Sequence, residues 1–189
     1  MKIAITGHTS GLGKEMFEHY VKQGHTVLGL SRSTGFDIIN TQDEIITAIE
    51  NFDLFINNTH ADESQLSLLD KAVNKVSKII VIGSALHLYR DIATFDYLEQ
   101  KQRLSYRCKM LNIDPSVLTK ILHVNISFLE NKDKGMISDN VITYNEILSV
   151  IDCWLDNPVL TDVTFAWKLT PVVLTQLQQI IPNLQVDFL

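Results

Sequence analysis

The feature that most constrains this chain is a regular alternation of short apolar runs with longer amphipathic segments. Because the apolar runs are continuous in Ile, Val and Leu, they predict strands buried on both faces of a sheet. The predicted strands are Lys2–Thr6, Thr26–Leu30, Leu54–Asn57, Ile79–Ile82 and Lys120–Ile126. Strand–helix alternation predicts an α/β fold with a Rossmann-type, doubly wound parallel sheet and helices on both faces.

Amphipathic periodicity predicts the helices between these strands. They are Leu12–Gln23, Gln42–Glu50, Ser64–Val76, Thr94–Leu111 and Tyr144–Leu155. Two helix starts have capping-box spacing, Thr41 with Glu44 and Thr143 with Glu146. We expect a further strand near Val163–Ala166 and a last helix from Pro171 to Ile181.

Length and charge bound the class of protein. The chain has 189 residues, so we expect residues 1–189 to form a single Rossmann-like domain. A formal net charge of −6 argues against nucleic acid and anionic membranes as partners, since both attract clustered Lys and Arg.

The N-terminal stretch indicates the compartment, and the spacing of cysteines, histidines and carboxylates indicates whether a metal is bound. The N-terminal stretch MKIAITG enters a strand-like run without a charged-then-apolar leader, so we expect a cytoplasmic protein. Cys108 and Cys153 lie in apolar helical runs, where we expect buried free thiols. Histidines, cysteines and carboxylates lack ligand spacing, so we expect no metal site.

The loop after the first strand is TGHTSGLG, Thr6 to Gly13. Its glycines permit a tight turn and a close backbone approach, so that a pyrophosphate can rest on the N–H groups of the following helix. Because the loop lies between a strand and a helix, it indicates a dinucleotide site. The expected cofactor-binding residues in this loop are Thr6, Gly7, Ser10, Gly11, Leu12 and Gly13.

The spacing T-G-x-x-x-G-x-G resembles the signature of the short-chain dehydrogenase/reductase family. That family pairs this loop with a serine after a later strand and with a Y-x-x-x-K motif further on. The matching residues here are Ser84, Tyr97 and Lys101, and Tyr97 follows Ser84 at the family's usual separation.

The resemblance implies a catalytic role for each of these three residues. Ser84 would hydrogen-bond the substrate oxygen, Tyr97 would exchange a proton with it, and Lys101 would bind the nicotinamide ribose. A free phenol has a pKa near 10, so we expect the Lys101 ammonium and the nicotinamide ring to lower the pKa of Tyr97. A nucleophilic role for Ser84 is not supported, because Gly83-Ser84-Ala85 does not match G-x-S-x-G.

The second strand ends without the acidic residue that usually selects NAD(H). Ser31 and Arg32 stand there instead, and Arg32 offers a 2′-phosphate two parallel hydrogen bonds. We therefore expect NADP(H) in preference to NAD(H); the alternative for Arg32 is an exposed, solvated side chain.

Further residues resemble cofactor-binding positions of the family. Asp37 resembles the aspartate that contacts adenine after the family's third strand, and a turn or cap residue is the alternative. Asn57 and Asn58 match the first two residues of the family's N-N-A-G motif, which lies close to the cofactor. By the same resemblance, Tyr97 and Lys101 of the Y-x-x-x-K motif are also expected to bind the cofactor. His60 departs from N-N-A-G, and it either narrows the cofactor passage, enters the substrate space or lies at the surface.

Substrate contacts are less well defined in the sequence. His87, Tyr89 and Arg90 lie where the family's substrate loop would run, with solvent exposure as the alternative. The family's fourth catalytic residue is an asparagine, but Asn74 is out of register with Ser84 and we do not assign it.

Three functions are consistent with these motifs. We expect an NADP(H)-dependent oxidoreductase that reduces a small carbonyl compound or oxidises the corresponding alcohol. The alternatives are a non-catalytic NADP(H)-binding sensor or interaction module and, third, a nucleotide-sugar epimerase or dehydratase. By resemblance we expect a homodimer or homotetramer formed through helices that include the Tyr97–Lys101 helix.

Overall fold

The computed structural model describes residues 1–85, 96–127, 129 and 142–165. In this part of the chain, six parallel strands form one sheet in the order β2-β1-β3-β4-β5-β6. The strands are β1 (Lys2–Thr6), β2 (Thr26–Leu30), β3 (Leu54–Asn57), β4 (Lys78–Ser84), β5 (Lys120–Ile126) and β6 (Asp162–Phe165). The predicted doubly wound parallel sheet is confirmed.

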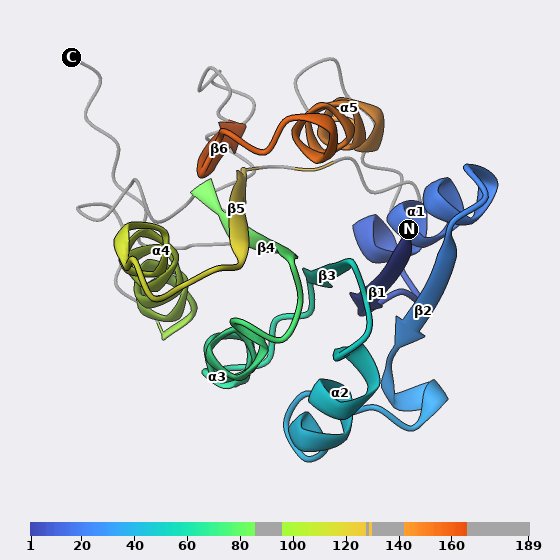
Figure 1. The fold of residues 1–189 in the computed structure, drawn as a ribbon, viewed down its shortest axis with the longest axis horizontal. Coiled ribbons are helices and arrows are strands. Elements are labelled where there is room, and N and C mark those ends of the chain that lie inside the picture. The colour runs from blue at the N-terminus through green and yellow to red at the C-terminus, as the bar shows by residue number, and fades with distance from the viewer. Residues whose placement is uncertain (86–95, 128, 130–141, 166–189) are drawn as a thin grey trace, which may run out of the picture.

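Helices cover both faces of this sheet (Figure 1). The helices are α1 (Gly11–Lys22), α2 (Gln42–Ile49), α3 (Ser64–Ala72), α4 (Asp96–Ile113) and α5 (Tyr144–Asp156). Helices α1 and α5 pack on one face around Tyr20 and Trp154. Helices α2, α3 and α4 pack on the other face around Phe55. Strands β1 to β5 therefore contribute side chains to both apolar layers, whereas β6 contributes Val163 and Phe165 to one layer only.

Strand β4 is longer than its apolar run predicts. Gly83 and Ser84 extend it beyond Ile82 by pairing with Asn125 and Ile126 of β5. The backbone ladder continues even though the side chains become small or polar. As a result, Ser84 belongs to the rigid sheet and is only 4% exposed.

The two predicted capping boxes have different outcomes. The box at α5 is confirmed, with Glu146 N–H donating to Thr143 Oγ1 at 3.3 Å and Thr143 N–H donating to Glu146 at 2.7 Å. The box at α2 is wrong, because Thr41 makes no side-chain bond to the helix. Its hydroxyl instead accepts from Asp37 N–H at 2.7 Å and donates to Asp37 O at 3.1 Å.

Several local expectations differ from the structure. Residues 36–40, where no strand is predicted, form an irregular segment and a turn. Cys108 is a buried free thiol as expected, but Cys153 is exposed, because it lies on the outer face of α5. The predicted helix Pro171–Ile181 lies outside the described residues. No helix among the described residues is both long and apolar enough to cross a membrane.

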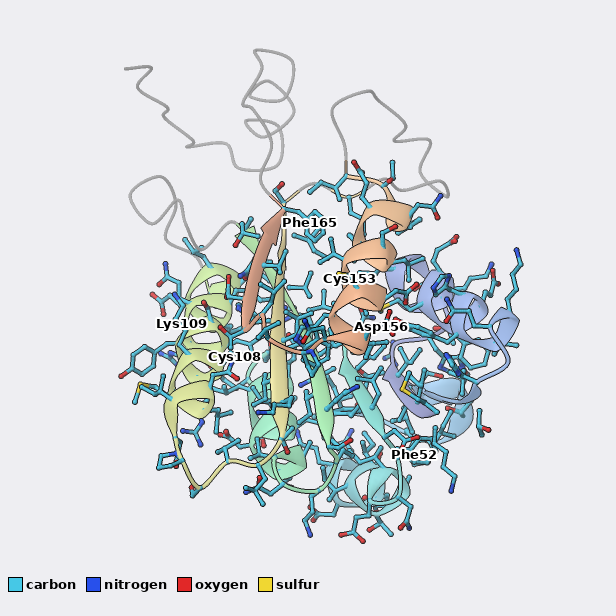
Figure 2. The ribbon with its side chains drawn as sticks, turned by 45° about the horizontal axis from the view of Figure 1, so that its top comes forward. Phe52, Cys108, Lys109, Cys153, Asp156 and Phe165 are labelled. Atoms are coloured by element: carbon cyan, nitrogen blue, oxygen red, sulfur yellow. The ribbon has the colours of Figure 1, made fainter. Side chains whose placement is uncertain are left out.

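The carboxyl ends of the strands lie at one edge of the sheet. In Figure 2, Phe52, just before β3, and Phe165, at the end of β6, lie toward opposite ends of the sheet. The chain reverses its direction of strand addition between β1 and β3, whose ends are Thr6 and Asn57. Ligands of doubly wound sheets bind at such a switch point, beyond the carboxyl ends.

Candidate functional site

The glycine loop joins β1 to α1 with backbone that only glycine accepts easily. Gly11 has a φ of +51° in the left-handed region, and a Cβ there would meet no atom within 4 Å. A Cβ on Gly13 would collide with the carbonyl oxygen of Gly7, because the loop folds back on the first turn of α1. The loop therefore lies close against the helix, with open space in front of it.

The start of α1 is open to an anion. Ser10 is exposed at the N-cap position and makes no side-chain bond to the helix. The first N–H groups of a helix have no partners within the helix, and they carry its positive dipole end. This terminus can hold a phosphate group in the way that the glycine spacing predicts.

A cavity of about 620 Å³ lies in front of this terminus. It extends from the end of β2 past the glycine loop to the segment after β3, and its size is in the range of ligand sites. The lining includes five of the residues predicted to bind the cofactor, namely Gly7, Ser10, Ser31, Arg32 and Asp37. The glycine cradle, the uncapped terminus and this lining together fit the adenosine diphosphate part of a dinucleotide.

The end of β2 presents a polar, cationic corner to this cavity. Arg32 is exposed, and none of the ion pairs among the described residues includes it. Ser31 Oγ lies 2.8 Å from Ser33 Oγ. These two serines flank Arg32 in the sequence, and all three residues line the cavity. This corner offers several hydrogen-bond donors to a further phosphate.

Asp37 has a structural role in addition to its place in the cavity wall. One carboxylate oxygen accepts from Ile39 N–H at 2.9 Å and the other from Asn40 Nδ2 at 3.1 Å. These bonds close an Asx turn, which is the alternative that the sequence left open.

The ends of β1 and β3 are joined by polar side chains. Thr6 Oγ1 accepts from Asn58 N–H at 2.9 Å and from Thr59 N–H at 3.0 Å. Asn58 Nδ2 donates to Thr6 O at 3.1 Å, and Asn57 Nδ2 donates to Gln65 O at 2.9 Å. The side chains of Thr6, Asn57 and Asn58 thus bind protein atoms, while Leu12 and Gly13 are buried beneath the loop.

Ser84 and Tyr97 meet across the end of the sheet. Ser84 ends β4 and Tyr97 is the second residue of α4, and their side chains share a hydrogen bond. Tyr97 is half-buried, with its ring at the edge of the His60 ring and 4.7 Å between centroids. Two hydroxyls predicted to contact one substrate oxygen are therefore adjacent.

Lys101 lies one helical turn after Tyr97 and is 3% exposed. Its ammonium lies over the Tyr97 ring, 5.6 Å from the centroid, within the range of a cation–π contact. It donates to Gln65 Oε1 at 2.7 Å and to Ile82 O at 3.3 Å. The structure thus brings together the three residues of the sequence motif.

Burial dominates the ionisation of this group of side chains. It raises the pKa of the Tyr97 phenol, although the hydrogen bond with Ser84 opposes this effect. Our expectation of a lowered pKa included the nicotinamide ring, so it stays a prediction for the chain with its cofactor bound. Burial also lowers the pKa of Lys101 from 10.5 to about 8, so the amine is mostly protonated at neutral pH.

His60 connects the cavity with Tyr97. It lines the cavity and contacts the Tyr97 ring, so it lies between the predicted nucleotide and reaction ends. Burial and the positive charge of Lys101 lower the pKa of His60, although Asp62 raises it. The imidazole is therefore neutral at neutral pH, because its ordinary pKa of 6.5 is already below 7.

Gln65 belongs to this site although no motif in the sequence predicts it. It is 2% exposed in the first turn of α3, and it is the closest hydrogen-bond acceptor of Lys101. It lies in the run SQLSLL, which contains no motif that predicts a functional amide. Asn74, the asparagine left unassigned, bonds Ser116 O and Leu118 N–H beyond the end of α3 and has a structural role. His87, Tyr89 and Arg90 lie outside the described residues.

Known structures share this architecture at low sequence identity. A short-chain dehydrogenase from Sphingobium yanoikuyae in complex with NADPH has 13% identity and a TM-score of 0.67, covering 100% of this chain and 98% of that one. The 3-alpha-hydroxysteroid dehydrogenase from Pseudomonas sp. B-0831, complexed with NADH, has 15% identity and a TM-score of 0.67, covering 88% and 95%. UDP-N-acetylglucosamine 4-epimerase from Bacillus cereus has 15% identity and a TM-score of 0.68, covering 100% and 88%. No protein-family model and no curated protein sequence matches the chain.

Proposed function

We propose that this chain, whose fold is that of the short-chain dehydrogenases/reductases, is an NADP(H)-dependent oxidoreductase that reduces a small carbonyl compound. The observation that carries the proposal is the meeting of Ser84, Tyr97 and Lys101 at the carboxyl edge of the sheet. They reach this point from β4 and α4, next to a cavity whose wall carries the glycine loop.

The cofactor would be held along this cavity. The N-terminus of α1 would take the pyrophosphate, and Arg32 with Ser31 would take a 2′-phosphate. The absence of an acidic residue at the end of β2 supports NADP(H), since a carboxylate there would repel this phosphate. Lys101 would contribute its remaining N–H to the ribose, because an ammonium has three donors and two of them are used.

The protonated state of Tyr97 suits proton donation to a carbonyl substrate. When bound, the reduced dinucleotide supplies the hydride that adds to the carbonyl carbon. The Tyr97 phenol donates its proton to the carbonyl oxygen, and Ser84 hydrogen-bonds that oxygen and orients it. A raised pKa keeps Tyr97 protonated at neutral pH, and an alkoxide is still far more basic than a phenolate. The Lys101 ammonium stabilises the phenolate that remains after proton transfer.

The chain would also form a homo-oligomer through α4. Tyr106, Met110 and Ile113 are 66%, 37% and 73% exposed and lie at helical spacing on its outer face. Such a row of exposed apolar side chains, on the helix that carries Tyr97 and Lys101, supports the expectation of a dimer or tetramer.

The function is tested with Y97F and its matched control Y106F. Both remove one phenol oxygen from α4, but Tyr106 is exposed and far along the helix from the site. We expect Y97F to reduce NADPH-dependent carbonyl turnover by about 10²- to 10⁴-fold while its Kd for NADPH is unchanged. Y106F should match the wild type in both measurements. Equal turnover in the wild type and Y97F would refute the catalytic role, and binding of NADPH without any turnover would favour the sensor alternative.

A further inference from the structure

Gln65 is a buried amide between the ends of two strands and α4. Its Nε2 donates to Asn57 O at 3.0 Å, at the end of β3, and to Ile82 O at 2.9 Å, in β4. Its Oε1 accepts from Lys101 Nζ at 2.7 Å. Both amide donors and the amide oxygen therefore have partners, as a buried amide requires.

These partners allow only one orientation of the amide. If the group were flipped, its oxygen would face two carbonyl oxygens and its NH₂ would face the Lys101 ammonium. Asn57 Nδ2 also donates to Gln65 O at 2.9 Å, which fixes the backbone of the first turn of α3 to β3. The sheet thus determines where Gln65 places its oxygen.

Lys101 depends on this oxygen. Its ammonium is buried, and its hydrogen-bond partners among the described residues are two neutral oxygens, Gln65 Oε1 and Ile82 O. Ile82 O is the more distant at 3.3 Å, and it is shared with Gln65 Nε2. Removing a short hydrogen bond from a buried charge disfavours the charged form strongly.

We propose that Gln65 is a positioning residue of this site, whose amide oxygen fixes the Lys101 ammonium over the Tyr97 ring and keeps it protonated. Its effect on turnover rests on the proposed function, but its effect on Lys101 does not. Among residues 1–85, 96–127, 129 and 142–165, the titratable groups that act on Lys101 or face it are Tyr97 and Cys108 on α4 and His60 after β3.

The first test measures the titration of Lys101 directly. The carbon-13 shift of its Cε, identified by its loss in K101M, is followed from about pH 6 to about pH 11. We expect Q65M to lower the midpoint by about one pH unit, because the ammonium loses its closest acceptor. We expect Q65E to raise it, because a carboxylate favours the neighbouring charge. The same midpoint in the wild type, Q65M and Q65E would overturn the proposal.

Gln42 supplies a matched control for the loss of an amide. Its Nε2 donates to Ile38 O at 2.8 Å and to Ser64 O at 3.2 Å, so it also supports the start of α3 without contacting Lys101. We expect Q42M to leave the Lys101 midpoint unchanged. A shift in Q42M as large as in Q65M would show a general loosening of α3 and would overturn the positioning role.

A second measurement applies even if the Gln65 variants do not fold. In the wild type, the carbon-13 shift of Gln65 Cδ should titrate with the same midpoint as Lys101 Cε, and in K101M this titration should disappear. A Gln65 Cδ shift that does not change while Lys101 titrates would overturn the proposal. If the coupling is present but no carbonyl compound is reduced, the positioning role stands and the proposed function fails. If both hold, the pH profile of kcat/KM should move with the Lys101 midpoint in Q65M and not in Q42M.

Discussion

Replacing Lys101 by methionine separates the energetic effect of this buried amine from every other titrating group. The pKa of Lys101 falls from 10.5 to about 8 because burial disfavours its charge. The pKa difference of about 2.5, at about 1.4 kcal/mol per pH unit, means that the charged amine destabilises the folded chain by about 3 to 4 kcal/mol. A residue that is 3% exposed gains little from solvent screening, so most of this cost should be measurable.

The sign of the pH dependence follows from proton counts. Below about pH 8 the amine is protonated in the folded and unfolded chain, so the cost is fully present. Between about pH 8 and pH 10.5 the unfolded chain binds more protons, so the free energy of unfolding rises with pH. K101M lacks this group and therefore lacks this rise.

The assay is urea unfolding of the wild type and K101M at a series of pH values. The unfolding free energy of the wild type minus that of K101M should increase by about 2 to 3 kcal/mol between about pH 7 and about pH 10. Taking the difference cancels the titration of shared groups on which Lys101 does not act. A difference that stays flat over this range, or falls, would refute the conclusion that burial depresses the pKa of Lys101.

Three further outcomes are expected. R32A should weaken NADPH binding by about 10- to 100-fold and NADH binding little, by calorimetry, since only NADPH carries the phosphate; equal losses would exclude this role. D162N should lower the unfolding free energy by about 1 kcal/mol at neutral pH, allowing for a side chain that is 34% exposed. Burial favours the neutral form of Asp162, but hydrogen bonds from His123 and Asn125 lower its pKa. The loss of unfolding free energy in D162N should therefore vanish as the pH falls through the pKa of Asp162 in the folded chain. A loss that persists in acid would contradict the pairing. M110E should shift the chain to monomers in sedimentation, and an unchanged mass would place any interface elsewhere.

Much of the fold could be predicted because its signals are local. Strands β1, β2, β3 and β5 have the predicted bounds. Each is a short apolar run that lacks the helical repeat of an amphipathic segment, so a strand could be predicted from the run itself. The site could be located for the same reason, because its motifs follow strand ends that a parallel sheet brings to one edge.

The remaining features depend on packing that no local pattern encodes. Thr41 has ideal capping spacing, yet the turn at Asp37 takes its hydroxyl. The pKa of Tyr97 rises because burial outweighs its hydrogen bond with Ser84, a balance that motif spacing cannot express. Gln65 and Lys101 lie 36 residues apart in the sequence, and they meet only because α3 and α4 pack side by side on one face of the sheet.

The most direct measurement is a crystal structure of the chain grown with NADP⁺. We expect the 2′-phosphate at Arg32, the pyrophosphate at the N-terminus of α1, and the nicotinamide ring beside Tyr97 and Lys101. A dinucleotide bound elsewhere, or a nicotinamide ring remote from the Tyr97 hydroxyl, would contradict the claim that these residues form a reductase site.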